Sequence, residues 1–365
     1  MRLWLFRHGI VSVIFVSVAL VLGTGASFGQ AGAPFKKLVE ASQKELDKKN
    51  GELTIGLEWV EELANNTLKS FQQEFPFIKK LTFIRMSKVE NMQRLLLEVQ
   101  QGKMPKFDIT TISSEVWSDY RKAGLFLKPA FDYRSLAKSL PPDWGTIDAR
   151  AIDPKGYYIA GTALIRGGLV YNSEAIPADK APKSWEDCVN PMYKGKVLFD
   201  PRNKSAGFQH DPKTREWFLK WLKNLVANQV VLNRGQIENI EKVAGGEFPL
   251  FCGVNYYSAM PLIEKGAPVK YVLPDPYPLE FGTQIHVLKW SQTPATTQLF
   301  AVWMASKGQE ALGKYAFRSF PWKPNTPIYA LAKGKYAAIC DVECLNKSDQ
   351  YEKEVADILK LPGVR

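Results

Sequence analysis

The sequence of 365 residues predicts an α/β protein built from two lobes. In residues 53–112 and again in residues 196–273, segments with strand-like alternation are interleaved with segments of helical spacing, which is typical of a parallel sheet covered by helices. Two stretches, 161–172 and 274–282, connect these units, and the second begins with three prolines in five residues, which exclude a helix there. The length is enough for two hydrophobic cores. We therefore expect two α/β lobes joined by a two-stranded hinge, with a ligand cleft between them.

The first unit is predicted from apolar periodicity and from helix start and stop signals. Leu53, Ile55 and Leu57 alternate with polar or small residues, as in a half-buried strand. Apolar residues at helical spacing follow and stop at Pro76. A capping box from Ser87 to Glu90 opens the next helix. The expected strands are 53–57, 81–84 and 107–112, and the expected helices are 61–75 and 89–102.

The second unit repeats this alternation, and a strand and a helix follow it. The expected strands are 196–200, 248–252, 269–273 and 281–288, and the expected helices are 213–228, 236–244, 256–265 and 295–307. We expect the chain to cross from one lobe to the other within each of the two connections. Residues 34–168 and 276–365 then form the first lobe, and residues 169–275 form the second.

Residues 1–31 have the features of a cleaved signal peptide. Arg2 and Arg7 precede an apolar stretch of 13 residues, Ile10 to Leu22, and small residues follow it. The stretch is too short to span a membrane, which takes about 20 apolar residues. We expect cleavage between Gly29 and Gly32 and a soluble mature protein in the periplasm.

The charge of the chain is basic, with 48 Lys and Arg against 37 Asp and Glu and a net charge of +11. Removing residues 1–33 takes away two arginines and no acid, so the net charge falls to +9. The lysines are spread over helix faces without interleaved aromatic residues, so we expect no nucleic-acid partner. The basic net charge therefore indicates only a preference of the protein for an anionic solute.

The four cysteines lie in the predicted mature chain, where an oxidising compartment permits disulfides. Cys340 and Cys344 are close enough in sequence to bridge a local turn. Cys188 and Cys252 are either buried thiols or a second disulfide, and their positions do not distinguish the two.

Catalytic motifs are missing from the sequence, so we expect no enzyme and no catalytic residues. The chain has neither a phosphate-binding glycine loop nor a Gly-x-Ser-x-Gly elbow. Only His210 and His286 remain after cleavage; we place His210 in a surface loop and interpret His286 as structural. An exported hydrolase that uses scattered carboxylates is the remote alternative.

The loops that follow the predicted strands hold the candidate binding residues. Ligands of α/β sheets bind beyond the carboxyl ends of strands, near helix N-termini. These loops contain Glu58, Trp59, Ser113, Ser114, Ser205, Tyr256 and Tyr257. Because adjacent tyrosines on a helix face different sides, at most one of the pair belongs to a core.

Several motifs together resemble one family. They are residues 169–174, 182–187, 193–197, 200–202, 246–247, 256–259, 265–269 and 295–309. They resemble the bacterial extracellular solute-binding proteins of ABC importers, family 1, in the branch of ferric-iron type. The resemblance covers roughly residues 50 to 320. It implies a type II periplasmic-binding-protein fold and partners in an ABC permease and its ATPase. We expect a monomer without a cofactor.

The resemblance leaves the ligand open between two classes. Ferric members use a neighbouring tyrosine pair with a synergistic anion, and Tyr256 and Tyr257 match that pair as metal ligands. The usual histidine of the first lobe is missing, although Glu58 could replace it. Other members bind organic or phosphorylated anions, for which Arg166, Ser113, Ser114 and Ser205 would supply donors. We favour the organic or phosphorylated anion, with ferric iron as the alternative transported ligand. A sensory role is not distinguished from import.

Overall fold

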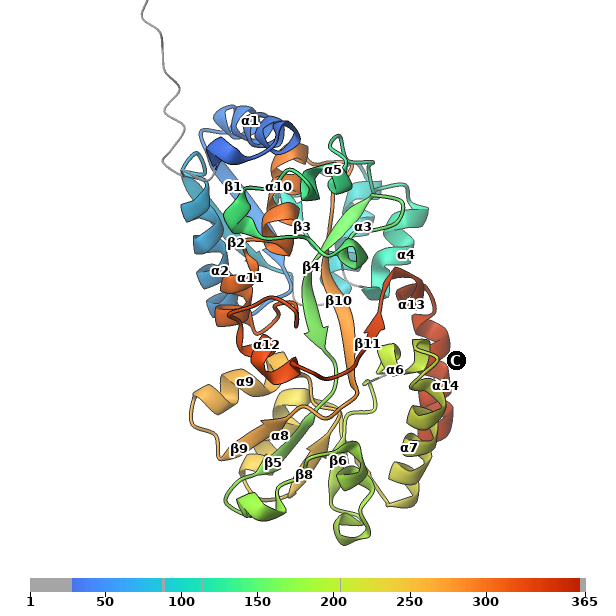
Figure 1. Cartoon of the computed structure of the whole chain (residues 1–365). Helices are drawn as coiled ribbons and strands as arrows, with labels where there is room; N and C mark the ends of the chain where they lie inside the picture. Colours follow the sequence, from blue (N-terminus) through green and yellow to red (C-terminus); the bar gives the residue numbers. More distant parts are fainter. Residues whose placement is uncertain (1–27, 87–88, 113, 204, 362–365) are drawn as a thin grey trace, which may run out of the picture.

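The computed structural model describes residues 28–86, 89–112, 114–203 and 205–361. It contains three sheets, and Figure 1 shows one at each end of the molecule with the third between them. Most of the predicted signal peptide and the start of the predicted capping box, Ser87 and Lys88, lie outside the described residues. Phe28, the first described residue, stacks on Phe75 with ring centroids 5.8 Å apart.

The first lobe has the predicted parallel sheet. β1 (Glu52–Leu57) lies between β2 (Lys80–Arg85) and β3 (Ile109–Thr110). The surrounding helices are α1 (Ala33–Asp47), α2 (Glu61–Glu74), α3 (Val89–Gln100), α4 (Ser114–Lys122) and α5 (Tyr133–Ala137). β3 is shorter than expected because Thr111 already leaves the sheet and forms an antiparallel bridge with Ile285.

The middle sheet contains the strands that connect the lobes. β4 (Tyr158–Ile165) is antiparallel to β10 (Tyr277–His286), and β11 (Ala337–Cys340) runs parallel to β10 on its other side. β4 leads through residues 166–168 into the second lobe, and β10 returns from it. Both crossings therefore fall within the predicted connections. β4 was not predicted, because every one of its residues is buried and the sequence shows no alternation.

The second lobe has a mixed sheet instead of the parallel one predicted. Its order is β7 (Val231–Leu232), β6 (Val197–Phe199), β8 (Leu250–Cys252), β5 (Leu169–Asn172) and β9 (Val269–Val272). β6, β7 and β8 are parallel, whereas β5 is antiparallel to both of its neighbours. The helices are α6 (Ala206–His210), α7 (Arg215–Ala227), α8 (Gln236–Ala244) and α9 (Tyr256–Glu264).

The helix that follows β10 is the most buried helix of the first lobe. α10 (Pro294–Ala305) is buried at eleven of its twelve positions. Its N-terminus lies against α1, where the Glu45 carboxylate accepts the backbone N–H groups of Ala295 and Thr296. A carboxylate at a helix N-terminus satisfies free N–H groups and complements the helix dipole. α11 (Gln309–Ala311) and α12 (Pro327–Ala332) complete this part of the chain.

The C-terminal residues return to the second lobe. After β11 come α13 (Val342–Asn346), which contacts α6, and α14 (Ser348–Leu359), which runs beside α7, as Figure 1 shows at the right. Val355 and Leu359 belong to the same core cluster as Phe218 and Leu222 of α7. Residues 342–359, placed in the first lobe above, thus pack on the second, and the division of the chain into lobes stays a prediction.

The two histidines lie in different surroundings. His286 is buried at the end of β10, stacks on Phe126 with centroids 4.0 Å apart, and accepts a hydrogen bond from Trp117 Nε1. His210 does not lie in a surface loop as predicted. It ends the short helix α6 and is half-buried. Tyr351 of α14 packs against it, with its hydroxyl oxygen 3.0 Å from His210 Nδ1.

Two disulfides are present. One joins Cys340 to Cys344, the pair expected from its spacing, and the other joins Cys188 to Cys252. The second pair closes a much longer loop, with a sequence separation of 64 residues against 4. In the loop-entropy account, a disulfide stabilises by restricting the unfolded chain, more so for longer loops.

We predict unequal losses of stability when each disulfide is replaced by alanines. Cys188→Ala/Cys252→Ala should lower the free energy of unfolding by about 4 kcal/mol and Cys340→Ala/Cys344→Ala by about 2 kcal/mol. Urea unfolding followed by circular dichroism measures both. Equal losses would show that local packing, and not loop length, governs these bonds.

We predict that His286 makes the protein acid-sensitive. Burial lowers its pKa to about 3, whereas a histidine in an unfolded chain titrates near 6.5. Between these values the unfolded chain holds a proton that the folded chain lacks, so stability falls as the pH decreases from about 6.5 to about 3. His286→Gln should make this decline shallower in urea titrations at several pH values.

Trp117→Phe is the control for this prediction. It removes the hydrogen bond to His286 but keeps the titrating imidazole, so the free energy of unfolding should fall while its acid slope is retained. An unchanged slope in His286→Gln would contradict the assignment.

Candidate ligand-binding site

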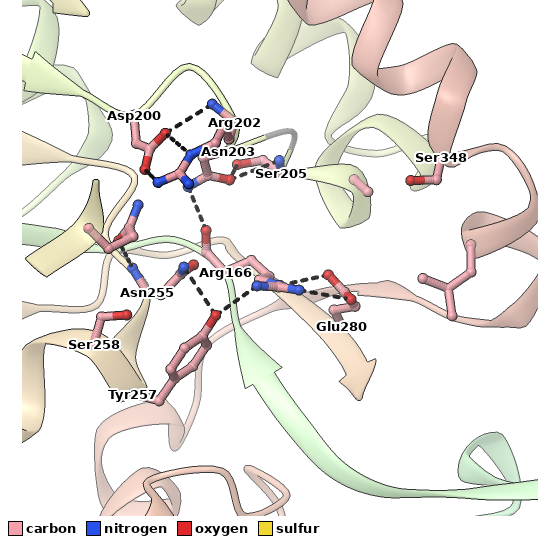
Figure 2. A pocket seen from close by; sticks show the side chains of 13 residues that line it. Arg166, Asp200, Arg202, Asn203, Ser205, Asn255, Tyr257, Ser258, Glu280 and Ser348 are labelled. Carbon is pink, nitrogen blue, oxygen red and sulfur yellow. Dashed lines mark hydrogen bonds and ion pairs between the residues drawn. The ribbon is translucent and has the colours of Figure 1, made fainter. Parts of the chain in front are cut away.

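A cavity of about 370 Å³ lies where the two lobes meet. It is built from the crossing between β4 and β5, the loop after β6, the start of α9, strand β10 and the C-terminal segment (Figure 2). Its lining residues are Arg166, Asp200, Arg202, Asn203, Ser205, Ala206, Gln236, Asn255, Tyr257, Ser258, Glu280, Leu345 and Ser348. Eleven of these thirteen side chains are polar or charged or, as in Tyr257, end in a hydroxyl.

Arg166 is at the centre of the cavity. It immediately follows β4, and its guanidinium makes a bidentate ion pair with Glu280 of β10, with N–O distances of 2.7 and 3.1 Å. Its remaining terminal nitrogen, Nη1, donates to the hydroxyl of Tyr257 at 2.8 Å. Burial opposes the charge, but Glu280 and Tyr257 outweigh it and raise the pKa of Arg166. The guanidinium is thus charged and held in one orientation.

A second arginine and carboxylate pair is made within the loop after β6. Asp200 ends that strand and accepts from the backbone N–H and the side chain of Arg202 and from the backbone N–H of Gly235. Burial alone would raise the pKa of Asp200, but these hydrogen bonds lower it. Arg202 is 58% exposed and faces the cavity. The charge of the Asp200 carboxylate is therefore compensated within the loop, and the Arg202 guanidinium faces the cavity.

Asn203 and Ser205 fix the rest of this loop to the crossing strand. The Asn203 amide donates to the carbonyl oxygens of Arg166, at 2.8 Å, and of Gly253. Its oxygen accepts from both the backbone N–H and the hydroxyl of Ser205. Ser205 has a left-handed backbone (φ 42°) and directly precedes α6. The loop of the second lobe is thereby tied to the same backbone that supports Arg166.

The starts of α8 and α9 supply further donors. The Tyr257 hydroxyl oxygen accepts from Arg166 and from Asn255, so its own O–H has to point to another acceptor. The Gln236 side-chain oxygen accepts from the backbone N–H of Asn255, which leaves the Gln236 amide N–H₂ facing the cavity. Ser258 also lines this side. Among the described residues, neither the Gln236 amide nitrogen nor the Ser258 hydroxyl has a hydrogen-bond partner.

Arg318 lies next to the cavity on the side of the first lobe. Its guanidinium carbon is 4.3 Å from the ring centroid of Tyr257 and 5.5 Å from that of Trp59. In the described part of the chain no carboxylate forms an ion pair with Arg318. Burial lowers its pKa, and the nearby Tyr257 and Glu58 only partly oppose this. A smaller cavity of about 80 Å³ continues from Arg166 and Glu280 to Glu58.

The two adjacent tyrosines have different surroundings. Tyr256 is 3% exposed, belongs to the large core cluster, and packs edge-on against Tyr271 with centroids 5.3 Å apart. Burial raises its pKa to about 12. Successive helix positions point about 100° apart, so only Tyr257 faces the cavity. Of the pair that the sequence offered as metal ligands, Tyr257 lines the cavity and Tyr256 does not.

The other sequence-predicted candidates are divided between cavity, core and undescribed positions. Arg166, Ser205 and Tyr257 line the main cavity, and exposed Glu58 lines the smaller one. Trp59 is 2% exposed and belongs to the core, where it supports Arg318. Ser113 lies outside the described residues, and Ser114 begins α4. Gln236, Glu280 and Arg318 were not predicted. Arg202, Asn203 and Asn255 lie in the loops after β6 and β8, from which only Ser205, Tyr256 and Tyr257 were selected as candidates.

The described residues lack two other kinds of feature. No group of three or more His, Cys, Asp and Glu side chains there could hold a metal ion. Among the helices described, none is long and apolar enough to cross a membrane.

Comparisons with known proteins identify the family. A model of the bacterial extracellular solute-binding proteins matches residues 66–318. The comparison with curated proteins gives no significant match.

Solved structures of this fold are similar to the chain over most of its length. Iron-bound HitA from Pseudomonas aeruginosa is 18% identical with a TM-score of 0.62, covering 84% of this chain and 99% of HitA. An open ferric iron-binding protein A from Mannheimia haemolytica is 18% identical with a TM-score of 0.63, and the match covers 84% of this chain and 98% of that protein. AfuA from Actinobacillus pleuropneumoniae, bound to fructose-6-phosphate, is 22% identical with a TM-score of 0.59, and the match covers 85% of this chain and 99% of AfuA. The chain has their type II periplasmic-binding-protein fold, and it belongs to the bacterial extracellular solute-binding proteins.

Proposed function

We propose that this protein captures a small organic or phosphorylated anion between its lobes and delivers it to a membrane permease of an ABC importer. The observation that carries this proposal is the chemistry of the cavity. Its two carboxylates, Asp200 and Glu280, are each already paired with an arginine. What remains for a ligand is a set of hydrogen-bond donors from Arg202, Gln236, Tyr257 and Ser258, with Arg318 beside them. Such donors suit phosphate or carboxylate oxygens.

Arg318 adds an electrostatic reason. Arg318 is half-buried, and a guanidinium in that position without a paired carboxylate is costly, because its charge is incompletely solvated. An anion next to Tyr257 would compensate that charge, and the aromatic rings of Trp59 and Tyr257 already hold Arg318 in place. The donor set and this uncompensated cation favour the same class of ligand.

Transport would use the two crossings as a hinge. Residues 166–168 and the chain between β9 and β10 connect the lobes, and the cavity lining comes from both sides of these crossings. A ligand that bridges donors of the two lobes stabilises the closed arrangement, and its release at the permease reopens it. No part of this cycle needs a covalent step, which is consistent with a binding protein and not a hydrolase.

The alternative ligand, ferric iron, has weaker support. Its phenolate ligands would have to come from Tyr256, which is buried in the core, and Tyr257, whose oxygen already accepts two hydrogen bonds. HitA and the ferric iron-binding protein A of Mannheimia haemolytica bind iron, but at 18% identity they share only the fold with this chain.

We predict that Arg202→Gln weakens anion binding about tenfold or more, because a hydrogen bond to a charged group contributes roughly 1.5–3 kcal/mol. Calorimetric titration with fructose 6-phosphate, glycerol 3-phosphate and citrate measures the affinities.

Arg150→Gln is the matched control. Arg150 makes the same bidentate pair with an aspartate two residues before it, Asp148, but does not line the cavity. Its replacement should leave each affinity unchanged. Equal losses in the two variants, or no binding of any of these anions to the unaltered protein, would contradict the proposed function.

We also predict that ferric iron with carbonate or citrate gives no ferric–phenolate absorption band. The Tyr256 phenol is buried in the core, and the Tyr257 oxygen already accepts two hydrogen bonds. Visible spectroscopy of the protein refolded without ligand tests this. A band that disappears in Tyr257→Phe would establish the iron alternative.

A further inference from the structure

We propose that the C-terminal segment 337–359 is a third wall of the solute cavity and that Leu345 selects organic anions over inorganic anions of similar charge. This inference rests on the proposed function and specifies the ligand class of the same cavity. The segment lies beyond residue 318, where the family match ends.

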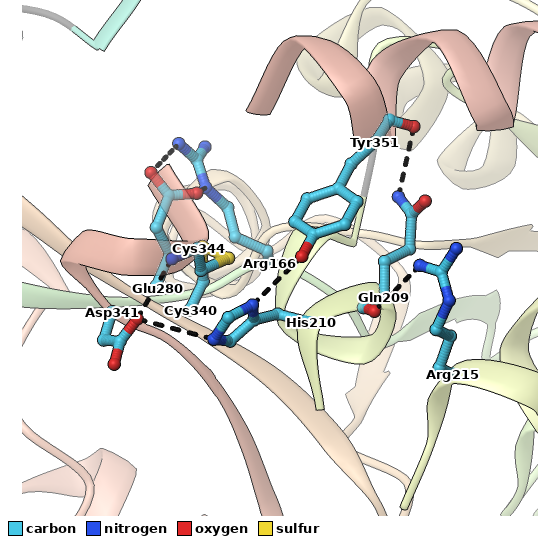
Figure 3. The surroundings of a disulfide bond; sticks show 9 residues. All are labelled: Arg166, Gln209, His210, Arg215, Glu280, Cys340, Asp341, Cys344 and Tyr351. Carbon is cyan, nitrogen blue, oxygen red and sulfur yellow. Dashed lines mark hydrogen bonds and ion pairs between the residues drawn. A yellow bond between two sulfur atoms is a disulfide. The ribbon is translucent and has the colours of Figure 1, made fainter. Parts of the chain in front are cut away.

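The segment begins directly beside the central ion pair. β11 pairs with β10 so that Cys340 is the register partner of Glu280, the residue that holds Arg166. Figure 3 shows the Cys340–Cys344 disulfide next to Glu280 and Arg166. The turn closed by this disulfide leads into α13, which carries Leu345. The position of Leu345 is thus determined by β11, the strand that pairs with β10 directly beside the Arg166–Glu280 ion pair.

Leu345 contributes the longer of two aliphatic side chains in a polar cavity. Among the described residues that line the main cavity, only Leu345 and Ala206 are aliphatic. Both pack against the cluster formed by Cys340, Cys344 and Tyr351. Leu345 also lines the smaller cavity toward Glu58, so it stands where the two cavities join. It is half-buried, and part of its surface remains uncovered.

The wall is held rigidly against the second lobe. Arg215 of α7 makes a bidentate ion pair with Glu354 of α14, at 2.9 and 2.7 Å. Tyr351 contacts the His210 ring nitrogen at 3.0 Å. Asp341 caps α13 by accepting the backbone N–H of Cys344. The first two contacts join the segment to α7 and α6, and the third orders its own first helix, so the segment is an integral part of the lobe and not a loose tail.

The consequence for the ligand follows from the placement of the polar and apolar surfaces. In the view of Figure 2, Ser348 of this segment and Ser258 of α9 stand on opposite sides of the central arginine. An anionic group held by Arg202 and Tyr257 leaves Leu345 and Ala206 uncovered. A ligand with a carbon skeleton attached to that group covers them and removes apolar surface from water, which an inorganic anion cannot do.

The test compares Leu345→Ala with the unaltered protein by calorimetric titration. The probes are fructose 6-phosphate, glycerol 3-phosphate and citrate, with inorganic phosphate and sulfate as the inorganic anions. We expect Leu345→Ala to lose about fivefold or more in affinity for the organic anion that binds tightest and to keep its affinity for phosphate. Ile358→Ala is the matched control, because Ile358 lies in the same segment but packs on the second-lobe core. It should leave all affinities unchanged.

The outcomes separate this inference from the proposed function. Equal organic-anion affinities in Leu345→Ala and the unaltered protein would overturn the role of Leu345 while the anion site stands. An equal loss in Ile358→Ala would show a general effect of destabilising the segment and would also overturn it. Failure of every anion to bind the unaltered protein would overturn both proposals.

Discussion

The ion pair between Arg166 and Glu280 is the interaction on which the geometry of the cavity depends. Arg166 begins one crossing between the lobes, and Glu280 lies on β10, the strand that makes the other. The pair therefore joins both crossings at one point. Tyr257 is oriented by the Arg166 guanidinium, and Asn203 is held by the Arg166 carbonyl oxygen. Removing either partner of such a half-buried pair would leave an uncompensated charge and also release side chains that belong to both lobes.

Much of the fold could be predicted because its signals are local. The helix at 236–244 has the predicted bounds, and α2 ends one residue before the expected position, since apolar spacing and prolines act over a few residues. β4 has no local signal, because a strand buried on both faces shows no alternation. The start of β10 was placed too late, at residue 281, because the prolines up to Pro278 were interpreted as a non-helical connection, whereas Pro278 lies inside the strand.

The site was less predictable, because it depends on contacts between distant segments. Adjacency alone showed that at most one of Tyr256 and Tyr257 is in a core, and the structure shows that Tyr256 is the buried one. Glu280 and Arg318 had no motif around them. They reach the cavity only because β10 pairs with β4 and because the chain after α10 returns beneath Trp59 and Tyr257. The spacing of residues in the sequence does not indicate which distant segments come into contact.

The charge of the cavity links ligand binding to stability. Arg318 lies between two aromatic rings, burial lowers its pKa, and no carboxylate among the described residues is paired with it. An unfolded chain would solvate this guanidinium fully, so folding without ligand carries an electrostatic cost at this position. A bound anion would reduce that cost only in the folded protein, and a ligand that binds the folded state alone stabilises it. The basic net charge of the chain, +11, is therefore less informative about the ligand than this one guanidinium.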